Sequence, residues 1–131
     1  MKNPFQPGDK KLYQKTVMET DFAQFEAGLV HKVCSTFALA QAAEWASRLF
    51  VLEMKDQDEE GIGTRLLIDH KGPAFLNETI TITATVKSFE RNELICTYEA
   101  KVGDRLVATG ETGQKILKKE KLNQLFNIAP L

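Results

Sequence analysis

The clearest pattern along the chain is an alternation of threonine with apolar residues between positions 79 and 86. A period of two is typical of a β-strand that has one buried face and one polar face. Less regular runs of β-prone residues predict four further strands, over residues 12–20, 64–70, 94–101 and 106–117. Short polar turns separate the last three strands along the chain, which indicates a meander of antiparallel hairpins.

One long run without glycine or proline, residues 37–54, has a different pattern. Its alanines make it thin, and its large apolar residues leave almost no polar face. These features predict a helix of about 27 Å that other elements bury on nearly all sides. Ser35 and Thr36 supply N-cap chemistry at its start. The preceding residues, 21–34, fit a short amphipathic turn that Gly28 interrupts.

One buried helix and a strongly curved antiparallel sheet of five strands make an α+β domain, predicted over residues 1–131. A short helix over residues 118–128 ends it. This order resembles the hot-dog fold, in which the sheet wraps around one long central helix. The edges of so small a sheet need covering. The resemblance implies that two copies join their sheets in a homodimer, with a dimer of dimers as a further option.

Composition narrows the classes of function. The chain has 131 residues, of which 43% are hydrophobic and 27% charged, the balance of a single globular domain. With 17 basic and 18 acidic side chains, it has no net field that would attract nucleic acid or an anionic membrane. No apolar run approaches the roughly 20 residues of a membrane span. The N-terminus lacks a signal-peptide core, so we predict a cytoplasmic protein.

The sequence predicts no metal site. Cys34 and Cys96 form no Cys-x-x-Cys pair and are expected to stay reduced as thiols. Residues 56–61 begin like a calcium loop, with oxygen ligands at alternate positions and glycine at the sixth. Leu67, however, occupies the twelfth position, where such a loop requires a bidentate carboxylate.

Three polar residues lie in apolar surroundings and are candidates for chemistry. Glu44 is in the middle of the predicted buried helix, where desolvation would raise the pKa of a carboxyl toward that of a general base. Alternatively, Glu44 and Arg48 form an ordinary surface pair at i,i+4. His70, on the same strand face as Leu66 and Ile68, could be a general base, a ligand or a satisfied core residue. Thr36 is by itself a helix cap rather than a nucleophile, and Ser35 competes for that role.

Taken together, these residues resemble the fluoroacetyl-CoA thioesterase-like family of the hot-dog superfamily. Glu44 follows Thr36 by eight residues, and His70 follows Glu44 by twenty-six. The similarity extends over roughly residues 30–125, and its individual elements are unspecific while their order and spacing are fairly specific. The matching segments are Val33-Cys34-Ser35-Thr36, Glu44-Trp45-Ala46, Gly63-Thr64, His70, Pro73 and Gly110-Glu111-Thr112.

The resemblance implies an acyl-CoA thioesterase that hydrolyses a short-chain acyl-CoA to the free acid and CoA. Thr36, Glu44 and His70 would be the catalytic set, and the Gly63 N–H would position the acyl carbonyl, with Ser35 also at the substrate. No cofactor is implied, because CoA is part of the substrate. The last strand carries Gln114 where the family has a basic side chain, so fluoroacetyl specificity is not carried over.

Two alternatives stay open at this point. One is a non-catalytic acyl-CoA-binding hot-dog protein, since a fold can keep a pocket without turnover. The other is a hot-dog dehydratase or isomerase, which the Thr–Glu–His spacing does not favour.

Overall fold

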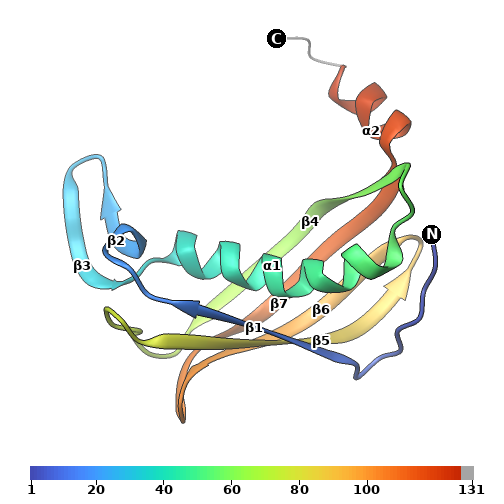
Figure 1. Ribbon diagram of the computed structural model, residues 1–131. Helices are drawn as coiled ribbons and strands as arrows, with labels where there is room; N and C mark the ends of the chain where they lie inside the picture. Colours follow the sequence, from blue (N-terminus) through green and yellow to red (C-terminus); the bar gives the residue numbers. More distant parts are fainter. Residues whose placement is uncertain (128–131) are drawn as a thin grey trace.

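The computed structural model describes residues 1–127, and its main feature is one antiparallel sheet with a long helix across one face (Figure 1). The central strands follow one another as a meander, as the sequence predicts. The first strand of the chain pairs with β5, and the strand after the helix pairs with β7. The order across the sheet is β1 (Lys10–Thr16), β5 (Thr79–Glu90), β6 (Glu93–Val102), β7 (Arg105–Lys118) and β4 (Glu59–His70).

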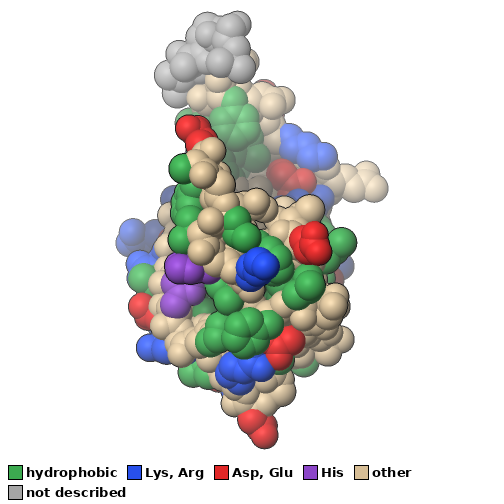
Figure 2. Space-filling model, turned by 90° about the vertical axis from the view of Figure 1, so that its left-hand side faces the viewer, with side chains coloured by type: hydrophobic (Ala, Val, Ile, Leu, Met, Phe, Trp, Pro, Cys, Tyr) green, Lys and Arg blue, Asp and Glu red, His purple; other side chains and the backbone are tan. Residues whose placement is uncertain are grey.

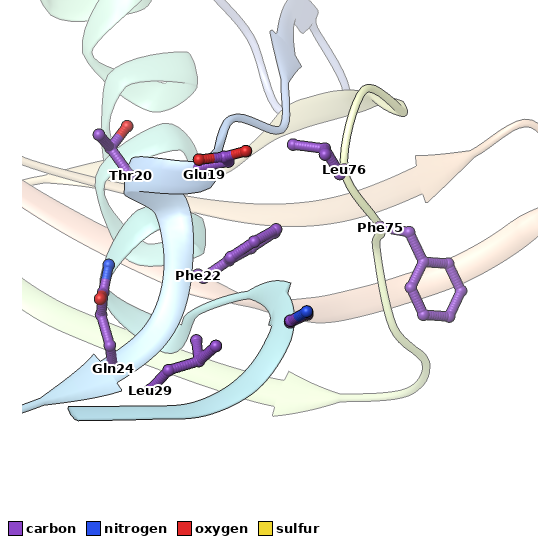
Figure 3. Close-up of a pocket in the computed structure, with 8 residues that line it drawn as sticks. Glu19, Thr20, Phe22, Gln24, Leu29, Phe75 and Leu76 are labelled. Carbon is purple, nitrogen blue, oxygen red and sulfur yellow. The ribbon is translucent and has the colours of Figure 1, made fainter.

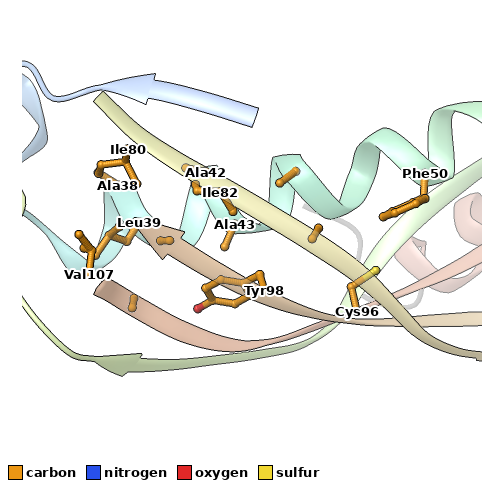
Figure 4. Packing of buried hydrophobic residues seen from close by; sticks show 14 of the residues in the cluster. Ala38, Leu39, Ala42, Ala43, Phe50, Ile80, Ile82, Cys96, Tyr98 and Val107 are labelled. Carbon is orange, nitrogen blue, oxygen red and sulfur yellow. The ribbon is translucent and has the colours of Figure 1, made fainter. Parts of the chain in front are cut away.

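The core lies between this sheet and helix α1 (Thr36–Met54) (Figure 4). Small side chains of the helix, among them Ala43 and Ala46, are almost fully buried and let the backbone approach the strands closely. The opposing strands contribute the alternating apolar residues of the period-two pattern, such as Ile80 and Ile82. The predicted α+β architecture, five antiparallel strands and one long helix, is confirmed.

The prediction that the helix is buried nearly all round is wrong for the protomer. The sheet covers one side of α1 only. On the other side Phe37, Trp45 and Leu52 are each at least 40% exposed. Five strands of this length curve around only part of a helix, so the sequence pattern of a fully apolar helix indicates a second contact surface.

Residues 22–34 form a β-hairpin rather than an amphipathic turn. Strand β2 (Phe22–Phe25) pairs with β3 (Gly28–Cys34), and a 3-10 turn, η1 (Glu19–Asp21), precedes them. Gly28 has φ +114°, a conformation that favours glycine, so the residue that interrupts a helical pattern here makes the hairpin turn. The hairpin stands away from the main sheet next to the start of α1 (Figure 1).

Several boundaries also differ from the prediction; the first strand, for example, ends at Thr16 rather than at residue 20. Strand β4 begins at Glu59, not at Thr64, because residues 59–63 already pair with residues 114–118 of β7. Helix α2 spans Lys119–Phe126, and the predicted end at residue 128 lies outside the described residues. Neither α1 nor α2 has the length and apolar character needed to cross a bilayer.

Candidate active site

Thr36 and His70 meet at the start of α1. Thr36 is the first residue of the helix and His70 the last of β4, and both are exposed. Thr36 Oγ1 lies 2.9 Å from His70 Nε2, a hydrogen bond that joins a hydroxyl to an imidazole. A satisfied core histidine is therefore the wrong interpretation of His70. The arrangement is that of a hydroxyl with a base within reach of its proton.

The capping role falls to Ser35 and leaves Thr36 free. The Ser35 side chain is 4% exposed, and its hydroxyl oxygen accepts the Ala38 N–H at 3.1 Å. The expected contact of Ser35 with substrate stays a prediction, and the buried position of its hydroxyl does not favour it. Because Ser35 satisfies the helix end, the Thr36 hydroxyl can bond to His70.

A β-bulge decides which β4 residues face the helix. Gly63 and His70 are seven residues apart, an odd number that would put them on opposite faces of a regular strand. The pairing of β4 with β7 shifts between Gly63 and Arg65, and Thr64 has no partner in the register. The bulge resets the alternation, so Gly63 and His70 both face α1.

Glu44 lies against Gly63. A Cβ atom placed on Gly63 would lie 3.0 Å from Glu44 Oε1, so any side chain there would press on the carboxylate. Glu44 is exposed in the protomer, which corrects the predicted burial. The alternative pairing with Arg48 is also wrong, because Arg48 Nη2 instead bonds Glu60 Oε1 at 2.7 Å. Glu44 thus carries no cation partner among residues 1–127.

The described residues therefore form two polar pairs rather than one triad. Thr36–His70 is at the N-terminal end of α1, and Glu44–Gly63 is two turns along it. Eight residues of helix correspond to about 12 Å along its axis. A single thioester carbonyl cannot touch both pairs of one protomer at once.

Gln114 lies beneath Glu44 rather than in the open site. Its side chain is 3% exposed, and its amide nitrogen is 3.4 Å from the Glu44 main-chain carbonyl oxygen. The neighbouring strand position is similar: Thr112 Oγ1 donates to Ser47 Oγ at 2.6 Å. Gln114 thus contacts the helix backbone, where a longer basic side chain was expected to contact the site.

Two sets of hydrogen bonds on the strand and loop around His70 could not be predicted from the sequence. The Tyr98 hydroxyl donates to the Leu67 carbonyl oxygen at 2.8 Å, across a position where a side chain on Gly110 would collide with that oxygen. Burial raises the pKa of Tyr98 to about 12, so it remains a donor. At the loop that follows β4, Arg105 forms two hydrogen bonds with Glu78, at 2.8 and 2.5 Å, and holds this loop.

The acidic cluster at residues 56–59 is neutralised by cations of the chain. Asp56 and Glu59 contact the Met1 ammonium, and Asp58 Oδ2 lies 2.8 Å from Lys118 Nζ. The hydrogen bonds from Lys118 hold the pKa of Asp58 below its ordinary value. The cluster therefore belongs to the packing of the N-terminus against β4.

The sheet, its single central helix and the position of the site define a hot-dog protein. Solved structures agree. A Thermus thermophilus hypothetical protein, a member of the thioesterase superfamily, is 28% identical, with 95% of this chain and 92% of that chain covered and a TM-score of 0.90. The fluoroacetyl-CoA thioesterase FlK is 18% identical over 97% and 98% of the two chains, with a TM-score of 0.89. A hot-dog-like protein from Thermanaerovibrio acidaminovorans is 21% identical over 93% and 90%, with a TM-score of 0.85.

The family model of fluoroacetyl-CoA-specific thioesterases matches residues 17–120. The chain belongs to this family of thioester hydrolases, as the spacing of Thr36, Glu44 and His70 predicts. The comparison with curated proteins gave no match.

Proposed function

We propose that this protein hydrolyses a short-chain acyl-CoA thioester, with Thr36, His70 and Glu44 as its catalytic residues. The observation that carries the proposal is the 2.9 Å contact between Thr36 Oγ1 and His70 Nε2 on an exposed helix start, in a chain of a thioesterase family. No cofactor is needed, because CoA is part of the substrate. Cys34 and Cys96 are buried and unpaired, in keeping with a cytoplasmic location.

In the proposed reaction, water adds its oxygen to the thioester carbonyl carbon and the C–S bond breaks. The acyl group leaves as the acid, and the sulfur of CoA takes up a proton. His70 Nε2 accepts the proton, either from the Thr36 hydroxyl, which would then form an acyl-enzyme, or from a water that Thr36 orients. The start of α1 adds positive potential next to the developing oxyanion.

Glu44 and Gly63 take part, in our proposal, from a second copy of the chain. Strand β4 is at the edge of the sheet, and its other side pairs with none of residues 1–127 of the same protomer. Leu66 and Leu67, at its middle, are 47% and 44% exposed. Antiparallel pairing of two β4 strands about an axis at Leu67 would put Gly63 opposite His70 of the partner subunit, because the bulge at Thr64 adds one residue to the strand. Such a homodimer would join the two polar pairs that one protomer keeps about 12 Å apart.

Thiol release from acyl-CoAs of increasing length tests the reaction. We expect turnover to be highest with short chains and to fall about a hundredfold or more in Thr36→Val, His70→Gln and Glu44→Gln. Mass spectrometry of wild type during turnover decides between an acyl group on Thr36 and direct attack by water. CoA binding without thiol release by wild type would instead identify a non-catalytic binding protein. Undiminished turnover in all three variants would refute the catalytic set.

Mixing inactive variants tests the shared site. A heterodimer of Thr36→Val with Glu44→Gln has one doubly damaged and one intact site, so a random mixture should recover about one quarter of wild-type turnover. The matched control, Thr36→Val mixed with His70→Gln, should recover nothing, because both changes fall in the same half-site. Equal behaviour of the two mixtures would contradict a site built from both copies. Sedimentation velocity on Leu67→Glu, in which two carboxylates would meet at the axis, should show loss of the dimer.

A further inference from the structure

A hollow opens between the hairpin and the loop that follows His70. It has a volume of about 730 Å³, within the range of small-molecule sites. Phe22 and Leu29 come from the hairpin side, and Phe75 and Leu76 come from the loop on the other side (Figure 3). Neither Thr36 nor His70 lines this hollow, so it is separate from the pair described above.

The hairpin wall of this hollow continues along the chain to Thr36. Lys32, on the hairpin wall, is four residues before Thr36, and four residues of extended strand cover about 13 Å. The two walls are joined where they approach the helix, because the Cys34 N–H donates to the Ala74 carbonyl oxygen at 2.9 Å. A ligand with its reacting group at Thr36 could therefore extend into the hollow.

Lys32 is the basic residue of the hollow, and no ion pair with the described part of the chain uses its charge. The ion pairs among residues 1–127 do not include it. The other residues that line the hollow are apolar except for Glu19, Thr20 and Gln24. Figure 2 shows basic side chains next to hydrophobic ones on this end of the molecule. Glu19 lies farther from Lys32 than ion-pair distance, so both charges stay open to a ligand.

The loop wall is held rigidly and includes an aromatic ring. Arg105 Nη1 donates to the Pro73 carbonyl oxygen at 2.8 Å and pairs with Glu78, and the Phe75 N–H donates to Glu78 Oε1 at 2.7 Å. The Arg105 guanidinium also lies 5.4 Å from the centre of the Phe75 ring. Because Phe75 is fixed on one side and 47% exposed, it offers a pre-formed apolar surface to a flat or chain-like ligand.

We infer that the hollow binds the carrier part of the thioester substrate, with Lys32 at a phosphate group of CoA and the apolar walls along the rest of the carrier. The inference rests on the proposed function, since it takes a CoA thioester as the ligand. An ammonium without a partner in an apolar hollow fits an anionic group attached to a longer neutral chain. The negative charge of Glu19 repels the phosphate and weakens its binding.

Calorimetry with free CoA tests this inference without any turnover. Lys32→Gln should raise the Kd for CoA roughly three- to fivefold and make binding less dependent on salt. Glu19→Gln should lower the Kd, the opposite direction. Lys121→Gln, an exposed lysine on α2, is the matched control and should leave the Kd unchanged.

Two CoA fragments identify the phosphate. If Lys32 contacts the pyrophosphate, Lys32→Gln weakens CoA and 3′-dephospho-CoA equally; if it contacts the 3′-phosphate, only CoA is affected. Pantetheine, which has no phosphate, should bind both proteins alike. An unchanged Kd for CoA in Lys32→Gln, or an equal loss for pantetheine, would overturn the inference. CoA binding that depends on Lys32 in a protein without thiol release would refute the proposed hydrolysis and leave this site standing.

Discussion

Near the C-terminal end of α1 the sheet-facing side chains are sealed, and around its first turn the helix is open. Phe50, Val51 and Met54 have no exposed surface, and the ring of Phe5 meets Phe50 edge to face with centroids 4.9 Å apart. Around the first turn, Phe37 is 56% exposed and Thr36 bonds to His70. One continuous apolar helix thus contributes to the core along its length and carries the site at its N-terminal end, and large apolar residues alone do not distinguish the two roles.

Replacing the aromatic residues at the two ends of α1 should give the largest difference in the free energy of unfolding. Phe50→Ala removes a fully buried ring and should lower the free energy of unfolding by about 3–5 kcal/mol. Phe37→Ala removes an exposed ring whose aromatic neighbour is Phe25, at 5.4 Å between centroids, and should cost less than about 1 kcal/mol. Denaturant unfolding at low protein concentration measures both.

Repeating the unfolding experiment at several protein concentrations distinguishes the two variants further. If Phe37 is covered by a second copy, the cost of Phe37→Ala should grow as the concentration is raised, whereas the cost of Phe50→Ala should not. A loss for Phe37→Ala as large as that for Phe50→Ala at every concentration would show that the N-terminal end is core as well.

Much of the sealed end could be predicted from the sequence. The alternation at 79–86 and the glycine-free run at 37–54 depend on local periodicity, and the structure confirms both elements. The spacing of Thr36, Glu44 and His70 led to the resemblance to the family, which the family model confirms. Local patterns suffice where each residue's environment follows from its position in one element.

The open end could not be predicted in the same way. The bulge at Thr64 depends on how β4 pairs with β7, and it alone turns Gly63 and His70 to one face. Residues 22–34 fit an amphipathic turn as well as a hairpin until the φ of Gly28 is known. Glu44 was expected to be buried because the helix is apolar, but burial depends on what covers that face, which no local pattern contains.

Two neighbouring residues at the start of α1 have different roles. Ser35 stabilises the helix, and Thr36 takes part in the proposed reaction. Ser35→Ala removes the N-cap and should lower the free energy of unfolding by about 1 kcal/mol. Thr36→Val removes an exposed hydroxyl and should change it by less than about 0.5 kcal/mol, while turnover falls far more than in Ser35→Ala. Thermal unfolding and thiol release on both variants measure this. Similar stability losses in the two would contradict the division of roles between neighbouring hydroxyls.

The ion pair that fixes the loop at the open end should give the smallest effect, visible only through its pH dependence. Hydrogen bonds from Arg105 lower the pKa of Glu78 from 4.5 to about 2. A carboxyl with a lowered pKa stabilises the folded state fully above its unfolded pKa, and this contribution is lost as pH falls toward the folded value. The stability difference between wild type and Arg105→Gln should therefore be constant above pH 4.5 and vanish as pH approaches about 2. When the Glu78 carboxyl is titrated by NMR, the midpoint should rise toward its ordinary value in Arg105→Gln. An unchanged midpoint would show that Arg105 does not hold this carboxylate in solution.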